Sequence, residues 1–361
     1  MLEFDTVPAA RRPADERAAL LVDPGFGRVF TDHMITIRYS EDKGWYDARL
    51  EPFGPLSLSP ATAALHYGQE LFEGLKAYAL DGGGIGLFRP EANARRLNAT
   101  ADRLAMPRLP EELFLRAVRT LVEADRDWVP SGEGQSLYLR PYMIATDPFL
   151  GVRPSSEYLF GVIASPSGAY FAGGAKPITV WISQEYTRAA PGGTGAVKAA
   201  ANYAVSLRAQ AQAHDTGCDQ VVFLDAVERR WIEESGSMNL FFVYDQDGTP
   251  RLVTPPLNGS ILPGVTRDSV LTLARHRGWT VEERPYSVDE WRADASSGAL
   301  RETFASGTGV VITAIGTARS KDGEFLVGGA AEGPVTTAIR DLIVGIQRGR
   351  LEDPFGWSVP A

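Results

Sequence analysis

Lys198 is the residue of this chain whose type and surroundings point most directly to chemistry. A glycine-rich segment, 192–195, leads up to it, and Tyr203, Leu207 and Ala211 follow at the spacing of one helix face, so we expect Lys198 at the start of a helix. Lysine is scarce here because arginine supplies nearly all the positive charge. Unlike the arginine guanidinium, a lysine amine can lose its proton near neutral pH and act as a nucleophile or a base. Codon preference explains the scarcity equally well, and a solvated surface lysine remains an alternative.

Several other groups could complete a site for amine transfer with pyridoxal phosphate. Such a site needs an acid for the ring nitrogen and donors for the phosphate and for the substrate carboxylate. Glu234 is the candidate acid. Residues 262–266 would place backbone N–H groups at a helix N-terminus, which favours an anion, and Arg96 could pair with the same phosphate. The turn 306–309 offers a hydroxyl and an accessible backbone. Taken alone, each feature is also typical of an ordinary turn, helix start or surface side chain.

Other kinds of site lack essential parts in this sequence. A phosphate loop needs glycine before its lysine and a hydroxyl residue after it, but Val197 and Ala199 flank Lys198. The four histidines lie far apart and no H-E-x-x-H or Cys/His set occurs, so no metal site is expected. The sequence has no G-x-S-x-G of an α/β-hydrolase and no G-x-G-x-x-G between a strand and a helix, as in Rossmann dehydrogenases.

The overall composition limits the possible partners. A length of 361 residues suits two domains, each with its own core. The formal net charge of -9 and the lack of any Lys/Arg block argue against nucleic acid as a partner. The first residues mix acids with arginines, and no apolar run approaches the length of a membrane span, so no signal peptide or membrane anchor is expected. The single cysteine, Cys218, fits a reducing cytoplasm, and we expect it in the core.

The order of strand-like and helix-like segments predicts a mixed α/β fold with two domains. The predicted parts are an N-terminal arm over 1–22, loosely docked, a smaller domain over 23–165, an interdomain loop over 166–176 and a larger domain over 177–361 that carries the lysine.

Local signals refine this outline. Ser59-Pro60 predicts a helix that carries residues 66–74, and a β-hairpin is expected over 75–88. Glu234 is expected on a turn between two strands, and a further helix is expected to open at 262–267.

Together these motifs resemble the branched-chain amino acid aminotransferases, members of the class IV (fold type IV) pyridoxal-phosphate enzymes. The resemblance runs from about Asp23 to the C-terminus and is carried, in the family's order, by the segments 66–78, 88–90, 136–141, 192–203 and 257–265. It implies a two-domain fold of the kind found in D-amino acid aminotransferase. That enzyme and aminodeoxychorismate lyase would use the same cofactor residues, so they remain alternatives within the fold. A non-catalytic nucleotide-binding module would leave Lys198 and Glu234 without a role.

The resemblance also implies roles for single residues around pyridoxal phosphate. Lys198 is similar to the catalytic lysine that forms the Schiff base, and Glu234 to the partner of the pyridine nitrogen. Tyr203 resembles the tyrosine that hydrogen-bonds the phenolic oxygen, and Ser237 a hydroxyl residue near cofactor and substrate. The residues that match the phosphate cup are Arg96, Val265, Thr266 and Thr308.

The substrates follow from the same resemblance. Tyr67, Phe72, Tyr138 and Tyr170 resemble the aromatic wall of the side-chain pocket. Arg140 is similar to the group that admits the distal carboxylate of glutamate, and the backbone of Thr308 and Gly309 to the donors for the α-carboxylate. The implied reaction is a ping-pong transfer of the amino group between L-leucine, L-isoleucine or L-valine and 2-oxoglutarate, which gives L-glutamate and a branched-chain 2-oxo acid. The family's members are homodimers, so we expect a dimer.

Overall fold

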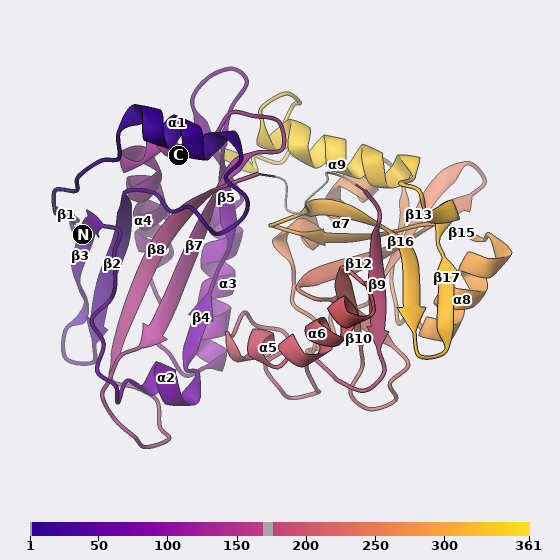
Figure 1. Cartoon of the computed structure of the whole chain (residues 1–361), viewed down its shortest axis with the longest axis horizontal. Helices are drawn as coiled ribbons and strands as arrows, with labels where there is room; N and C mark the ends of the chain where they lie inside the picture. The colour runs from indigo at the N-terminus through magenta and orange to yellow at the C-terminus, as the bar shows by residue number, and fades with distance from the viewer. Residues whose placement is uncertain (1, 169–175) are drawn as a thin grey trace. The chain divides into compact units, whose positions relative to one another are not determined.

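The computed structural model describes residues 2–168 and 176–361. The chain forms two compact units (Figure 1). The first contains residues up to 168 together with Lys198–Ala200 and Gly345–Ala361, and the second contains 176–197 and Ala201–Val344. Within the described residues, no helix combines the length and apolar character that a membrane span requires.

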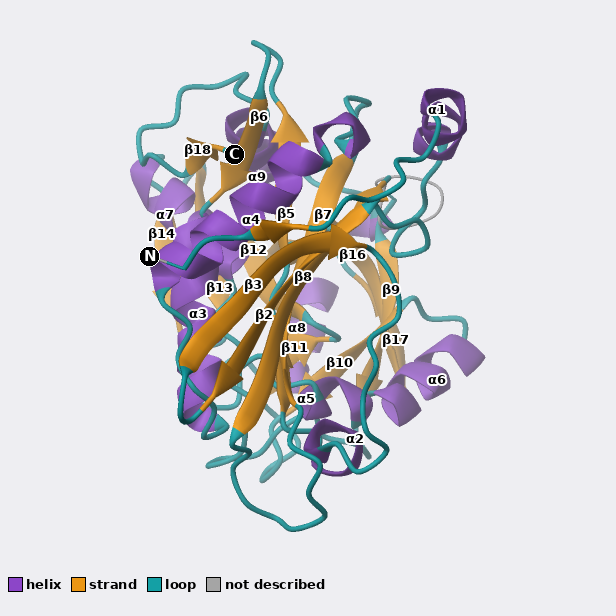
Figure 2. Ribbon diagram, turned by 90° about the vertical axis from the view of Figure 1, so that its left-hand side faces the viewer, coloured by secondary structure: helices purple, strands orange, loops and turns teal. Residues whose placement is uncertain are grey.

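The first unit is built on one sheet that is antiparallel except for its first pair. The described strands lie in the order β1, β3, β2, β8, β7, β5, β6, β18, and β4 pairs with β7. Figure 2 shows the pronounced twist of β2, β3 and β8. Their bounds are β1 (Asp5–Thr6), β2 (His33–Ser40), β3 (Gly44–Pro52), β4 (Glu70–Phe72), β5 (Leu75–Ala79), β6 (Ile85–Phe88), β7 (Ser136–Ala145), β8 (Glu157–Ser167) and β18 (Ser358–Pro360).

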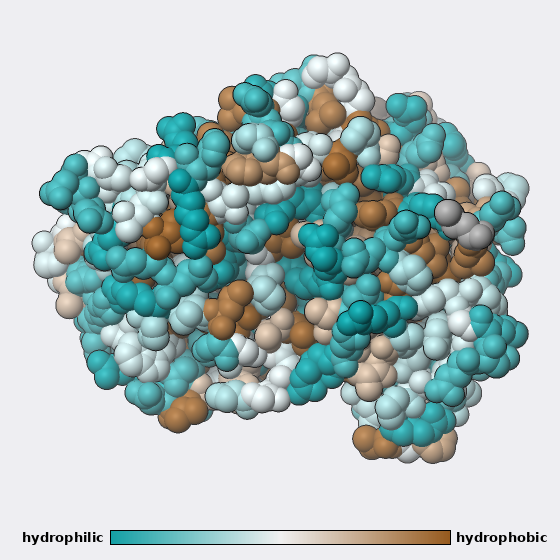
Figure 3. Space-filling model, turned by 180° about the vertical axis from the view of Figure 1, so that it is seen from behind, coloured by the Kyte–Doolittle hydropathy of each residue, from teal (hydrophilic) through white to brown (hydrophobic). Residues whose placement is uncertain are grey.

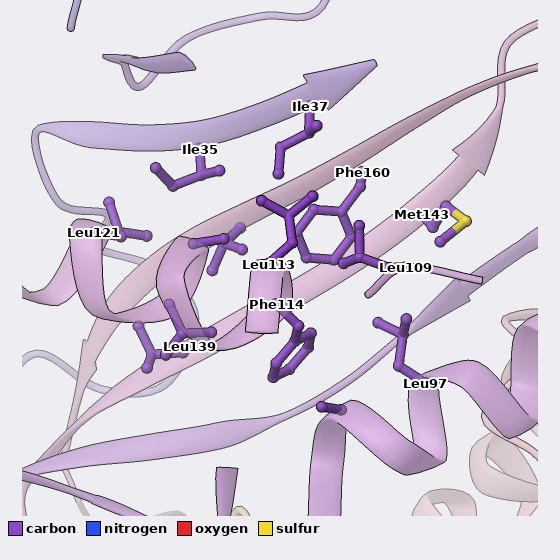
Figure 4. Close-up of a cluster of buried hydrophobic side chains, with 14 of the residues drawn as sticks. Ile35, Ile37, Leu97, Leu109, Leu113, Phe114, Leu121, Leu139, Met143 and Phe160 are labelled. Carbon is purple, nitrogen blue, oxygen red and sulfur yellow. The ribbon is translucent and has the colours of Figure 1, made fainter. Parts of the chain in front are cut away.

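Two helices supply most of the apolar cover of this sheet. α3 (Pro90–Arg103) has proline at its first position, and α4 (Glu111–Ala124) follows Pro110, as proline's fixed φ favours. The apolar face of α4 packs on β2 and β8. Figure 4 shows Leu113, Phe114 and Leu121 of this face beside Phe160 and Ile35 of the sheet. The smaller helical elements are α1 (Ala14–Val22), α2 (Ala63–Tyr67) and the 3-10 turn η1 (Arg126–Trp128).

The second unit is a barrel with extensions. Because β11 pairs with both β10 and β12, the strands β11, β10, β9, β16, β15 and β12 form a closed ring, which removes their exposed edges. β13 and β14 extend this sheet from β12, and β17 pairs with β16. The bounds are β9 (Ile178–Ser183), β10 (Gln220–Leu224), β11 (Ile232–Ser235), β12 (Met238–Gln246), β13 (Thr249–Thr254), β14 (Thr280–Glu283), β15 (Leu300–Gly307), β16 (Val311–Ser320) and β17 (Gly323–Leu326).

The helices of the second unit begin where the sequence supplies helix caps. Ser287 accepts the N–H of Glu290 at the start of α8 (Val288–Ser297), a capping pattern of serine and glutamate. At α9 (Pro334–Gln347), the buried Glu302 accepts the N–H groups of Val335 (2.9 Å) and Thr336 (2.7 Å). The remaining helical elements are α5 (Ala201–Ala204), α6 (Leu207–Asp215), α7 (Val265–His276) and η2 (Gly328–Ala330). Cys218 is buried in a core cluster with Phe223, as expected.

The N-terminal segment differs from the loosely docked arm expected for residues 1–22. β1 pairs with β3, and Leu2, Phe4 and Leu20 pack against the core of the first unit. These apolar side chains are interspersed with charged residues, so the sequence of the segment does not show a continuous apolar face.

The helix expected to carry residues 66–74 is also wrong in extent. α2 ends at Tyr67, because Gly68 adopts a left-handed conformation with φ 60°. The chain then enters β4, which pairs with Tyr142–Ile144 on β7. A helix across this segment would have left that edge of β7 unpaired.

One face of the surface is mixed in character. Figure 3 shows one face, on which apolar side chains occur as separate groups among hydrophilic ones. Separate apolar groups of this kind are normal on protein surfaces.

Candidate functional site

Lys198 is held in the first unit by main-chain hydrogen bonds. Its N–H donates to Thr100 Oγ1 (3.0 Å) and its carbonyl accepts the N–H of Phe72 (3.2 Å). Ala199 forms a β-bridge with Leu71, so the segment 198–200 runs along β4 on the side away from β7. The lysine is therefore positioned by strand pairing, and the residue is 9% exposed.

The helix expected to start at Lys198 begins later and is broken. The main chain of 198–200 is engaged with β4, so α5 starts only at Ala201 and α6 follows from Leu207. Tyr203, Leu207 and Ala211 do not form one buried face, because Leu207 and Ala211 are exposed while Ala209 and Ala213 are buried.

The surroundings of the lysine include a buried carboxylate. Lys198 Nζ lies 4.6 Å from the ring centroid of Phe72, and Glu73 follows that ring in the chain. Glu73 is fully buried and accepts Arg96 through both oxygens, from Nε at 2.7 Å and Nη2 at 2.8 Å. Asn93 donates to it at 2.8 Å. Burial acts to raise the pKa of Glu73, but the charge and hydrogen bonds of Arg96, with smaller effects of Lys198 and Asn93, hold it below its ordinary value.

Three of the residues predicted for the substrate pocket lie together in the first unit. Tyr138 and Arg140 lie two positions apart on β7, so their side chains share one face of the strand. Arg140 Nη2 donates to Tyr138 Oη at 3.1 Å, and its guanidinium carbon lies 4.6 Å from the centroid of Phe72. Arg140 Nε is buried and has no hydrogen-bond partner within the described residues. This cluster combines apolar ring faces with an unsatisfied cationic donor.

Tyr67 does not belong to this cluster. Tyr67 lies on α2, is 42% exposed, and donates to the carbonyl of Leu150 at 2.6 Å. Tyr170 lies outside the described residues.

Glu234 lies in the second unit on strand β11, one residue before its end, and not on the turn itself. Its side chain is 2% exposed. Oε1 accepts Arg188 Nη2 at 2.9 Å and also the N–H of Leu262. Arg188 is buried too, and the same nitrogen donates to the carbonyls of Gly195 and Ser260. The carboxylate therefore has a fixed position and a compensating charge.

Strand register brings the other predicted residues of the second unit to the same end of the barrel. Glu234 is paired with Asn239, and Asn239 with Ser306. The turn that contains Ser237 and the turn that contains Thr308 and Gly309 therefore leave the barrel side by side.

The start of α7 is tied to this end of the barrel. Asn239 Nδ2 donates to the carbonyl of Leu262 at 3.0 Å, directly before the helix. A Cβ on Gly264 would lie 2.2 Å from Asn239 Oδ1, so this close approach requires glycine. Val265 and Thr266 are the first two residues of α7, where the helix dipole favours an anion.

A hollow of about 220 Å³ lies next to Glu234 within the second unit. Its lining includes Tyr203, Glu234, Gly236 and Ser237. Gly236 has φ 58°, and a Cβ there would lie 2.3 Å from Gln220 Oε1, so the turn between β11 and β12 depends on this glycine. The hollow thus presents a buried carboxylate and the hydroxyl groups of Tyr203, Ser206 and Ser237 to a small polar ligand.

The sequence assigned no role to two residues of this arrangement, Glu73 and Arg188. Glu73 lies inside the segment 66–78 that resembles the family, and only its pairing with Arg96 in the structure indicates what it does. Arg188 precedes the glycine-rich segment, and no pattern in the sequence connects it to Glu234. No cluster of His, Cys, Asp or Glu suited to a metal ion occurs in the described ranges.

Comparisons with known proteins identify the family of this chain. A family model described as Amino-transferase class IV matches residues 70–316. A branched-chain-amino-acid aminotransferase of Mycolicibacterium smegmatis is 56% identical over 359 residues, which cover 99% of this chain and 97% of that protein. The structure of Escherichia coli branched-chain amino acid aminotransferase matches with a TM-score of 0.71 and 31% identity, over 86% of this chain and 95% of that one. A T.th. branched-chain amino acid aminotransferase solved with pyridoxamine 5'-phosphate matches with a TM-score of 0.73 and 25% identity, over 90% and 98%.

Proposed function

The chain belongs to the class IV aminotransferases, and on this basis we propose that it is a pyridoxal-phosphate-dependent transaminase of branched-chain L-amino acids. Its substrates are L-leucine, L-isoleucine or L-valine, and 2-oxoglutarate is the proposed acceptor of the amino group. The structural observation that carries the proposal is the hollow of the second unit, where the buried Glu234 lies with Tyr203 and Ser237.

The donor set of the chain fits the cofactor. When bound, pyridoxal phosphate supplies an aldehyde for the amino group and a ring that withdraws electrons. Glu234 would hold the ring N–H, and Arg188 supports this role because its hydrogen bond fixes the carboxylate and its charge compensates that of Glu234. Tyr203 would donate to the phenolic oxygen, and Ser237 would lie near cofactor and substrate. The phosphate would be held by Arg96, Thr308 and the backbone of Val265 and Thr266, where helix α7 begins.

Lys198 would hold the cofactor and then move a proton to and from the α-carbon of the substrate through Nζ. Its main-chain bonds to Thr100 and Phe72 fix the point from which the side chain extends toward the reacting atoms.

The cluster of the first unit suits both substrates of a transaminase. The rings of Phe72 and Tyr138 would enclose a branched aliphatic side chain by apolar burial. Glutamate must occupy the same space, and the buried Nε of Arg140 would then donate to its distal carboxylate. We retain Tyr67 and Tyr170 as proposed pocket residues, and the backbone of Thr308 and Gly309 as the proposed site of the α-carboxylate.

We further propose a cytoplasmic homodimer in which the region around Tyr67 contributes to the interface. Large apolar side chains near this residue are exposed in the single chain, with 63% for Leu65, 66% for Leu150 and 88% for Val152. Exposed apolar groups of this kind are typical of surfaces that a partner covers. Light scattering of purified protein should give twice the mass of the chain, and an active monomer would contradict the proposal.

A steady-state assay tests the activity. Purified protein is supplied with pyridoxal phosphate and 2-oxoglutarate, and with L-leucine, L-isoleucine, L-valine, L-phenylalanine or D-alanine in turn. Turnover of the three branched L-amino acids is the expected result. Turnover of D-alanine alone would instead indicate a D-amino acid aminotransferase, and a yellow protein without any turnover would point to aminodeoxychorismate lyase or another relative of the same fold.

A further inference from the structure

A second cavity of the second unit takes no part in the proposed reaction. Its volume is about 370 Å³, which is in the range of sites for small organic molecules. The walls are mainly apolar and come from the residues after β10 and β13, among them Trp231, Ile232, Pro255 and Pro256. The cavity is distinct from the hollow beside Glu234, because the two share no described lining residue.

A buried carboxylate lines this cavity. Glu233 is 3% exposed, and its Oε1 accepts Asn258 Nδ2 at 3.3 Å. Its Oε2 is buried without a hydrogen-bond partner in the part of the chain that the structure describes. The hydroxyl of Ser260 lies near enough to lower the pKa of the carboxyl, but it makes no hydrogen bond to Oε2. Burial has the largest effect and raises the pKa of Glu233, against the lowering effects of Asn258 and Arg188. A ligand that donates a hydrogen bond to this buried acceptor removes the free-energy penalty of leaving it without a partner.

Glu233 and Glu234 are neighbours on β11, so their side chains point to opposite faces of the strand. This alternation explains why one carboxylate belongs to the hollow of the proposed reaction and the other to the second cavity. The two sites can therefore be tested independently, because a substitution at Glu233 leaves the bonds of Glu234 to Arg188 and Leu262 in place.

The charged residues around the cavity determine which charge a bound ligand should carry. Asp225 and Glu228 contribute to its lining together with Glu233, and no described lysine or arginine does. The carboxylate of Asp225 accepts four main-chain N–H groups, including those of Glu228 and Trp231, and burial opposes but does not overcome their lowering of its pKa. A cation is therefore favoured in this cavity, and a ligand that carries a carboxylate is disfavoured.

We propose that this cavity binds a small organic ammonium compound whose apolar body packs against Trp231 and the prolines and whose N–H donates to Glu233 Oε2. An amine without a carboxylate fits the lining better than an amino acid. The site is independent of the proposed transamination, because none of its residues is assigned to that reaction.

A suitable probe is N,N-dimethyl-3-methylbutylammonium chloride. A tertiary ammonium has one N–H to donate and cannot condense with an aldehyde, so it does not react with the cofactor of the holoenzyme. 3-Methyl-1-butanol has the same apolar body without the charge and serves as the neutral comparison. Binding to the holoenzyme is measured by isothermal titration calorimetry near neutral pH.

Three variants locate the binding. Glu233→Gln removes the charge of the buried carboxylate, and Val227→Trp places a large ring at the lining of the cavity, where Val227 is 77% exposed. Glu123→Gln changes the net charge equally at an exposed position of α4 and is the matched control. We expect saturable binding of one ammonium per chain, weakened about 10- to 100-fold by Glu233→Gln, as for loss of a hydrogen bond between charged groups. Val227→Trp should also weaken it, and Glu123→Gln should not.

The proposal is overturned if the wild-type holoenzyme shows no saturable binding, if 3-methyl-1-butanol binds as tightly as the ammonium, or if Glu233→Gln binds the ammonium like the wild type. Should Glu233→Gln not fold, Val227→Trp decides the outcome, since unchanged binding by that variant also overturns the proposal.

Discussion

Arg188 Nη2 lies 2.9 Å from Glu234 Oε1, and both side chains are almost completely buried. The same nitrogen donates to the carbonyl of Gly195 at 2.9 Å and to that of Ser260 at 2.7 Å. One guanidinium group thus joins the glycine-rich segment, the strand that carries the carboxylate and the loop before α7. These bonds fix the position of the Glu234 carboxylate and place a compensating charge beside it, as the partner of a protonated ring nitrogen requires.

The first prediction concerns this pair. Arg188→Met should lower the free energy of unfolding by about 3 to 5 kcal/mol, because it leaves Glu234 charged and buried without its cation. Glu234→Gln added to Arg188→Met should cost less than the two single changes combined, with a coupling of about 1 to 3 kcal/mol. Chemical denaturation of the four proteins measures this cycle. Arg108→Met, which breaks an exposed pair with Asp102, is the control and should cost about 1 kcal/mol or less. Additive effects of the two changes would show that Arg188 does not support Glu234.

The second prediction concerns the lysine. Lys198→Ala should reduce kcat for L-leucine by about 10⁴-fold or more, because the chain then lacks the amine that moves the substrate proton. The fold should persist, since the bonds of Lys198 to Thr100 and Phe72 use its main chain, which alanine keeps. Circular dichroism checks the fold and single-turnover kinetics the rate. Lys321→Ala is the control, because Lys321 is exposed and pairs only weakly with Glu185 at 3.4 Å. A rate near that of the wild type would remove Lys198 from the mechanism.

Much of the fold follows from local signals in the sequence. The glycine-rich turn predicts the hairpin of β5 and β6, and the segment 262–267 predicts the start of α7. Each of these elements is determined by residues within a few positions of one another. The grouping of Tyr138 with Arg140 is of the same kind, because two positions along a strand share a face.

The elements that the sequence did not predict depend on contacts between distant segments. Gly68 ends α2 by its left-handed conformation, and the next residues become a strand only because β7 offers them an edge. Lys198 is excluded from a helix by pairing with β4, more than one hundred residues earlier in the chain. β18 joins the first unit by pairing with β6, from the opposite end of the chain. No local pattern contains such information.

The third prediction concerns acid stability. The pKa of Glu73 is held below its ordinary value of 4.5, so its pairing with Arg96 stabilises the protein fully above pH 4.5 and progressively less as the pH falls through the lower value of the folded state. Glu73→Gln removes this dependence and should lower the free energy of unfolding by about 3 kcal/mol at neutral pH. The difference between wild type and variant should shrink below pH 4.5. Thermal unfolding from pH 3 to 7 measures it, and a difference that does not change with pH would show that Glu73 is not charged in the folded state.

The last prediction uses a glycine to test the proposed substrate pocket. A Cβ on Gly74 would lie 2.1 Å from Tyr138 Oη, so Gly74→Ala must displace the ring and with it the bond from Arg140. We expect kcat/KM for L-leucine to fall by about 10- to 100-fold, because a side chain that orients the substrate moves by roughly 1 Å. The free energy of unfolding of Gly74→Ala should be about 1 to 3 kcal/mol lower than that of the wild type, as for an overpacked site. Gly82→Ala is the matched control, since a Cβ there meets no atom within 4 Å, and both properties should stay unchanged. If Gly74→Ala loses stability while kcat/KM for L-leucine and 2-oxoglutarate stays at the wild-type value, Tyr138 does not line the pocket and the aromatic wall must be sought elsewhere.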